Sequence, residues 1–188
     1  MRLFWLILAI ACGGEASSQP LEQACTNPEH LVGLIGVSIE NDPSGRLAAW
    51  VTGLNDAGYF NGLAGRAPYE MPGSTTFPHL IVAPNGALAD RAPEIIIKLD
   101  PSYPCGGAQT GGCHTWNCNV ATIHLHQVDT FILSHELVET IFHPNVEAPG
   151  TEIADACETW DHLAMMYVNG VLVLVASYLD AIGSCWPR

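Results

Sequence analysis

The chain has 188 residues, of which 48% are hydrophobic and 13% are charged. This composition supports one domain with a sizeable core and excludes an intrinsically disordered chain. The formal net charge is -13, and because so acidic a chain repels phosphate backbones, we expect no nucleic-acid partner.

Residues 1–11 have the pattern of a signal peptide. A positive charge at Arg2 precedes an apolar run that is too short to span a bilayer. The junction Ala11-Cys12 resembles the lipobox of bacterial lipoproteins, which predicts lipidation of Cys12; the alternative is an ordinary secretory peptide cleaved nearby. Residues 12–24 have linker composition and would form a lipidated or flexible tether. We therefore expect an exported protein, either a cell-envelope lipoprotein that meets the membrane only through its lipid anchor or a secreted protein.

Seven cysteines indicate a disulfide-bonded domain. If Cys12 carries lipid, six remain, enough for three disulfides whose pairing the sequence leaves open. These six are Cys25, Cys105, Cys113, Cys118, Cys157 and Cys185. A zinc knuckle in the loop around Cys113, with His114, is the competing interpretation, but export into an oxidising compartment favours disulfides.

Residues 25–188 are expected to form a single domain, and its first half is predicted as follows. The apolar run 31–40 predicts a buried strand. Apolar residues spaced i, i+3, i+4, i+7 from Leu47 to Leu54 predict a helix, with Asp42 as its cap and Pro43 at its first position. Further short strands are expected at 79–84, 94–100 and 119–127, and an irregular cysteine-rich loop is expected at 101–118.

The second half is predicted to begin with a helix that Asp129 caps and Pro144 ends. A short helical segment is expected at 151–160. Asn169-Gly170 between two apolar runs predicts a closing β-hairpin. The expected fold class is therefore α+β, with a mixed or antiparallel sheet, one long helix that carries the candidate site, a second short helix and a C-terminal hairpin.

The helix predicted after Asp129 carries the sequence SHELVET and with it the candidate metal ligands. His135 and Glu139 are four residues apart, so they share one face of the helix and can bind one cation. Glu136 is rotated about 100° around the axis. In HExxH enzymes this neighbour takes the proton of the metal-bound water. This chain has Glu139 where such an enzyme has its second histidine; the competing interpretation is a helix with solvent-facing polar residues.

A third ligand is expected from the segment TEIADACE, which offers Glu152 and Asp155. In a helix these two share a face, so one would bind the ion while the other orients a ligand. Asp155 is the preferred ligand and Glu152 the support, although the sequence leaves the choice open. Cys157 would anchor the segment by a disulfide, with Cys185 as a candidate partner.

HELVET, EIADACE and the closing YVNGVLVLVASYLDAIGSC together resemble the C-terminal half of the Exordium, or phosphate-induced, protein family. The resemblance covers about residues 130–186. That family is similar to zincin-type metallopeptidases without the second histidine. The resemblance implies a zincin-like fold and a metal site at His135, Glu139 and the Glu152/Asp155 pair, with Glu136 as the general base.

One divalent ion is expected at this site, with zinc as the first choice and calcium or manganese as alternatives. Exchanging an imidazole for the Glu139 carboxylate lowers the formal charge of the site, which weakens the ion as a Lewis acid and favours harder ions. The first functional hypothesis is a metal-dependent hydrolase of the peptidase type, in which metal-bound water attacks a peptide or protein substrate and Glu136 is the general base. The second is a non-catalytic binding or structural domain, stabilised by the metal and three disulfides.

Four further histidines lie outside this motif. His124 and His126 are two residues apart in a predicted strand, so they should face the same side. They are candidates for ligating a metal or lining a cleft, and the simpler interpretation is a half-exposed pair. His114 and His143 lie beside loops and prolines and are expected at the surface.

Overall fold

The computed structural model describes residues 34–63, 79–91, 93, 95–102, 111–117, 120–142, 153–157, 164–180 and 182–188. The predicted signal peptide (1–11) and tether (12–24) lie outside these residues. So do His143, Glu152 and four of the cysteines, Cys12, Cys25, Cys105 and Cys118.

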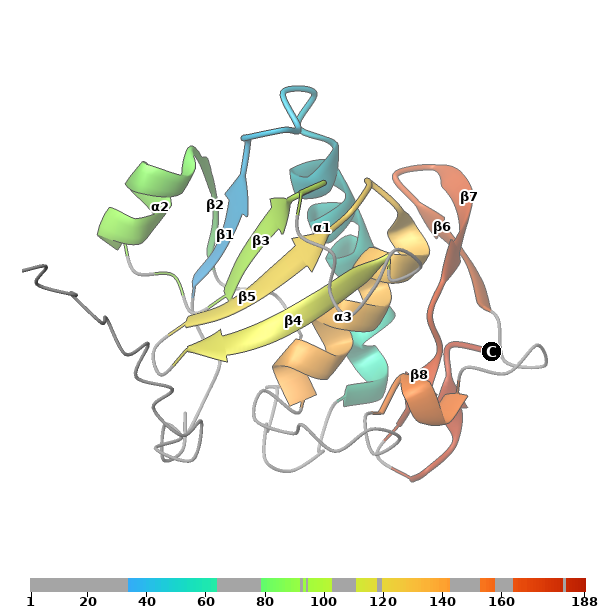
Figure 1. Ribbon diagram of the computed structural model, residues 1–188. Helices are drawn as coiled ribbons and strands as arrows, with labels where there is room; N and C mark the ends of the chain where they lie inside the picture. Colours follow the sequence, from blue (N-terminus) through green and yellow to red (C-terminus); the bar gives the residue numbers. More distant parts are fainter. Residues whose placement is uncertain are drawn as a thin grey trace, which may run out of the picture.

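A five-stranded mixed sheet forms the centre of the fold (Figure 1). The strands are β1 (Leu34–Ser38), β2 (His79–Ala83), β3 (Ile95–Leu99), β4 (Gly112–Asn117) and β5 (Val120–Leu125). Their order is β2-β1-β3-β5-β4; the first four are parallel, and β4 is antiparallel to β5. The strands predicted for β1, β2, β3 and β5 are confirmed, and the expected mixed sheet is present.

β4 corrects one prediction. Its residues lie inside the stretch 101–118, which the glycines and cysteines led us to expect as an irregular loop. The strand forms because Gly112–Asn117 pair residue by residue with Leu125–Val120 of β5. Pairing with a neighbouring strand outweighs the weak local β-propensity of this segment.

Helices cover both faces of the sheet. They are α1 (Arg46–Asp56), α2 (Asn85–Arg91) and α3 (Thr130–Phe142), with 3₁₀ helices η1 (Tyr59–Leu63) and η2 (Asp155–Cys157). α1 and α3 lie on the same face of the sheet (Figure 1), and α3 packs against β4 and β5. Ile35 and Val37 of β1 are buried in the core on this side. Gly36 between them points to the other face, where the unpredicted helix α2 packs so closely that a Cβ would stand 2.9 Å from Leu88 Cδ2.

α1 begins later than predicted. Gly45, in the left-handed conformation with φ 69°, is its N-cap, so Pro43 lies before the helix. Asp42 still satisfies a donor of the first turn, because its Oδ2 accepts a 2.7 Å hydrogen bond from the backbone N–H of Leu47. The predicted apolar face is confirmed, since Leu47 and Leu54 are fully buried.

The C-terminal hairpin is confirmed. β6 (Ala164–Val168) pairs with β7 (Val171–Val175) across Asn169 and Gly170, whose φ angles of 52° and 74° are those that a two-residue hairpin turn requires. The amide of Asn169 donates to the carbonyl of Ala49, which joins the hairpin to α1. β8 (Tyr178–Leu179) and β9 (Cys185–Trp186) form a second small pair.

The core lies between the sheet and the helices α1 and α3. Its members come from β1, β3 and β5, from both helices, from η1 and from the hairpin. Along the described chain, none of the helices combines the length and the apolar character that crossing a membrane requires.

Candidate metal centre

α3 is the element that carries the site, and its start is fixed by a cap. Asp129 Oδ1 accepts hydrogen bonds from the backbone N–H groups of Phe131 (2.8 Å) and Ile132 (3.2 Å), as predicted. Leu133 and Leu137 are fully buried against the sheet. The helix is therefore held along one side, and its polar residues His135, Glu136 and Glu139 are presented in fixed directions.

Two buried hydroxyl groups tie α3 to the chain that follows β7. Ser134 Oγ accepts a 2.9 Å hydrogen bond from the N–H of Ala176 and donates to the carbonyl of Phe131. The hydroxyl of Tyr59 lies between the two segments, 2.7 Å from the carbonyl of Ala176 and 3.2 Å from the carbonyl of Ser134 on α3. Burial, followed by the neighbouring Tyr178, raises the pKa of Tyr59 well above its ordinary value, so its hydroxyl is a permanent donor.

His135, Glu139 and Asp155 converge. His135 Nε2 lies 3.2 Å from Glu139 Oε2 and 3.4 Å from Asp155 Oδ1. The N–H of Asp155 donates a 3.2 Å hydrogen bond to the other oxygen of Glu139. The three residues thus come together from α3 and η2, two segments that the sequence separates by a proline-rich stretch.

The spacing of these donor atoms fits a metal ion. Ligands about 2.0–2.2 Å from a zinc ion at tetrahedral corners lie about 3.3–3.6 Å apart, and the distances from His135 Nε2 are 3.2 and 3.4 Å. An imidazole among the donors suits zinc, whereas calcium takes six to eight oxygen ligands. The three side chains therefore match zinc better than calcium.

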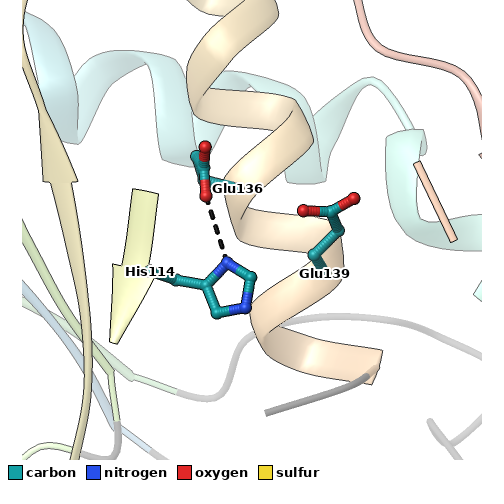
Figure 2. A group of neighbouring side chains, drawn as sticks. All are labelled: His114, Glu136 and Glu139. Carbon is teal, nitrogen blue, oxygen red and sulfur yellow. Dashed lines mark hydrogen bonds and ion pairs between the residues drawn. The ribbon is translucent and has the colours of Figure 1, made fainter. Parts of the chain in front are cut away.

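Glu136 faces a different neighbour, the imidazole of His114 on β4 (Figure 2). Its Oε2 lies 3.1 Å from His114 Nδ1. His114, Glu136 and Glu139 also offer donor atoms that all lie within 4.8 Å of one another. The expectation that His114 is a surface residue is wrong, because β4 places its side chain, 12% exposed, against α3.

A pair of glycines allows this approach. A Cβ at Gly112 would lie 2.7 Å from Ile132 Cγ2 and 3.0 Å from Glu136 Cγ, and one at Gly111 would lie 2.2 Å from Ile132 Cδ1. A side chain at either position would force Ile132 to move, so the two glycines let β4 lie close to α3 without that rearrangement. The sequence signal for this contact is Gly111-Gly112 followed closely by His114. We interpreted these residues as part of a loop because Cys105, Cys113 and Cys118 lie close to them in the sequence.

A disulfide holds the segment that supplies Asp155. Cys157, which ends η2, is bonded to Cys185 of β9, as the sequence suggested. The N–H of Leu179 donates to the carbonyl of Ile153, which fixes the start of the same segment. The described part of the expected second helix is the short η2, and the proposed supporting residue Glu152 lies outside the described residues.

The state of Cys113 argues against a zinc knuckle in the cysteine-rich loop. This cysteine is disulfide-bonded, so its sulfur is not a thiolate and does not bind a metal. His114 beside it belongs instead to the group with Glu136 and Glu139.

The prediction that His124 and His126 face the same side of a strand is wrong. β5 ends at Leu125, so the strand alternation stops between them: His124 is 8% exposed and His126 is exposed. Burial, followed by the charge of Lys98, lowers the pKa of His124, while Asp100, 3.7 Å away, opposes the shift. Neither histidine belongs to the two groups around Glu139.

The assignment of chemistry to this centre rests on the geometry of the chain's own residues. Comparisons with protein-family models, with curated proteins and with solved structures gave no match.

Proposed function

We propose that the protein is a metal-dependent hydrolase of the peptidase type, with His135, Glu139 and Asp155 as the ligands of one zinc ion. The observation that carries this proposal is their convergence, with His135 Nε2 at 3.2 and 3.4 Å from the two carboxylates. Glu139 is 1% exposed. A positive partner stabilises a carboxylate so deeply buried, and a bound ion would supply one.

Glu136 is proposed as the proton acceptor. A zinc ion in this centre would supply an activated water molecule and polarise the substrate carbonyl. Glu136 lies within 4.8 Å of Glu139, measured between carboxylate oxygens, and is held on its other side by His114. Its carboxylate takes the proton of the attacking water and passes it to the leaving amine of the substrate.

The position of β4 supports a peptide as substrate. β4 is the last strand in the order of the described sheet, and it lies beside α3 (Figure 1). The outer edge of such a strand offers N–H and C=O groups with which an extended peptide can pair. A peptide bound along this edge would pass close to His114 and Glu136.

We further propose that the protein belongs with the zincin-like, exported proteins that its sequence resembles. The mixed sheet, the site-bearing helix α3 and the closing hairpin are the parts that this resemblance implies. The disulfides at Cys157–Cys185 and at Cys113 favour an oxidising compartment.

A structural ion is the alternative. An ion at His135, Glu139 and Asp155 would join α3 to η2, next to the disulfide at Cys157. Two carboxylates also leave zinc less positive than two histidines and one carboxylate would, which reduces its power to activate water. In this second function the ion and the disulfides hold a surface for recognition.

Metal analysis followed by three variants tests these functions. Purified protein should contain about one tightly bound zinc ion per chain, and chelation should lower its melting temperature. Asp155→Asn should weaken zinc binding by about 10-fold or more. Asp100→Asn is the matched control, because it changes a carboxylate that also faces a histidine but lies in neither group, and it should leave zinc binding unchanged.

Glu136→Gln separates the two functions. In a hydrolase it should retain the ion at His135 and lower cleavage of a peptide library by about 10²–10⁴-fold, the contribution of a general base. If the wild-type protein holds the ion but cleaves no peptide, the structural ion is favoured. If no ion binds and chelation leaves the melting temperature unchanged, both functions are refuted.

A further inference from the structure

Glu139 takes part in two groups of metal-ligating side chains. One is His135, Glu139 and Asp155; the other is His114, Glu136 and Glu139, with donor atoms within 4.8 Å of one another in each. We propose that the second group is a second divalent-cation site, and that Glu139 is shared by two ions.

The second group is assembled by tertiary structure. His114 reaches from β4 toward Glu136, and Glu139 lies about one helical turn further along α3 (Figure 2). Glu136 is 8% exposed and Glu139 1%, and the His114 side chain is 12% exposed. The donors are one imidazole and two carboxylates, the same types as in the first group, so zinc-like ions are the class that this site takes.

The charge of the centre leaves room for a second ion. Three carboxylates, those of Glu136, Glu139 and Asp155, lie together, and within the described residues their ion pairs are with histidines rather than with lysine or arginine. One dication in the first group balances Glu139 and Asp155. Glu136 remains as a largely buried carboxylate, and a second dication beside it would compensate that charge.

A glutamate is able to serve both ions. Its carboxylate has two oxygens with about four lone-pair sites. In Glu139 one oxygen faces His135 and the other accepts the N–H of Asp155, and one of the two also lies within 4.8 Å of the donor atoms of His114 and Glu136. Ions in two-metal sites lie about 3.5–4 Å apart, a separation that one carboxylate spans. The second ion is the weaker one, because the first already neutralises part of the shared ligand and repels another cation.

Filling the second site has a consequence that rests on the proposed function. A Glu136 carboxylate bound to an ion cannot accept a proton, so occupancy of this site would slow hydrolysis. The existence of the site does not depend on that activity and is tested without it.

Metal binding at equilibrium provides the test. Protein stripped with a chelator is dialysed against increasing concentrations of Zn²⁺ and analysed for bound metal. The wild type should bind one ion tightly and a second more weakly. His114→Ala should weaken the second ion by about 10-fold or more and leave the first unchanged. His126→Ala, which removes an exposed histidine outside both groups, should bind both ions as the wild type does.

The outcomes distinguish this inference from the proposed function. Saturation at one ion refutes the second site and leaves the first standing, whereas no bound ion refutes both. Binding of two ions by His114→Ala with unchanged affinities also refutes the second site. If His114→Ala does not fold, as judged by circular dichroism, Glu136→Gln replaces it, since it too removes a ligand of the second ion alone.

Discussion

The disulfide between Cys157 and Cys185 should supply a measurable part of both stability and metal affinity. It joins residues 28 apart in the sequence. Loop-closure entropy for that length gives about 3.6 kcal/mol at 25 °C. The double variant Cys157→Ser/Cys185→Ser should therefore lower the free energy of unfolding by about that amount. Because Cys157 lies in the same three-residue helix as Asp155, the variant should also loosen Asp155, the proposed metal ligand.

Urea denaturation of the metal-free proteins measures the first effect, through the midpoint and slope of the transition. Competition with a chromophoric chelator measures the second, and the double variant should bind zinc more weakly. Tyr167→Ser is the control, since it changes a residue of the same disulfide loop that is 70% exposed on the hairpin. Unfolding free energies of variant and wild type within about 1 kcal/mol of each other would refute the entropic reasoning. Unchanged zinc affinity in a destabilised variant would show that Asp155 is positioned without the disulfide.

Three further predictions concern the supports of α3 and the buried histidine. Asp129→Ala should lower the free energy of unfolding by about 1 kcal/mol, because it removes the cap of α3, and urea denaturation measures the loss. Ser134→Ala should cost about 1–3 kcal/mol in the same assay, since it leaves the buried N–H of Ala176 without its acceptor; no change would mean that this N–H finds another partner. The pKa of His124 is lowered in the folded state, so the unfolded chain binds more protons, and the stability from this group, complete above pH 6.5, is lost as the pH falls through the folded pKa. His124→Gln should therefore flatten the fall in melting temperature between about pH 7 and 5, while His126→Gln should leave the slope unchanged.

The candidate site was predictable in part. The i, i+4 spacing of His135 and Glu139 is a property of any α-helix, so their shared face follows once the helix is recognised. The approach of Asp155 to this pair was expected, because TEIADACE places acidic residues in a cysteine-anchored segment shortly after that helix. His114 was missed because its position depends on a long-range contact that the chain makes only when β4 lies on α3.

The local patterns of this sequence determined most of its elements. The apolar runs of β1, β2, β3 and β5, the cap at Asp129, the apolar face of α1 and the Asn169-Gly170 turn each depend on residues near in the sequence, and each was predicted. The predicted start of α1 was wrong because Gly45 adopts a left-handed conformation and becomes the N-cap, which the composition of the segment does not reveal.

The tertiary structure decided the order of the strands, the presence of β4 at the edge and the partner of Glu136. Each of these depends on segments far apart in the chain meeting with the right spacing. Gly111 and Gly112 are the clearest example. Their sequence is typical of a loop, but in the fold their missing side chains allow β4 to lie close to α3. The contact between His114 and Glu136, 22 residues apart in the sequence, forms across this close approach of β4 to α3.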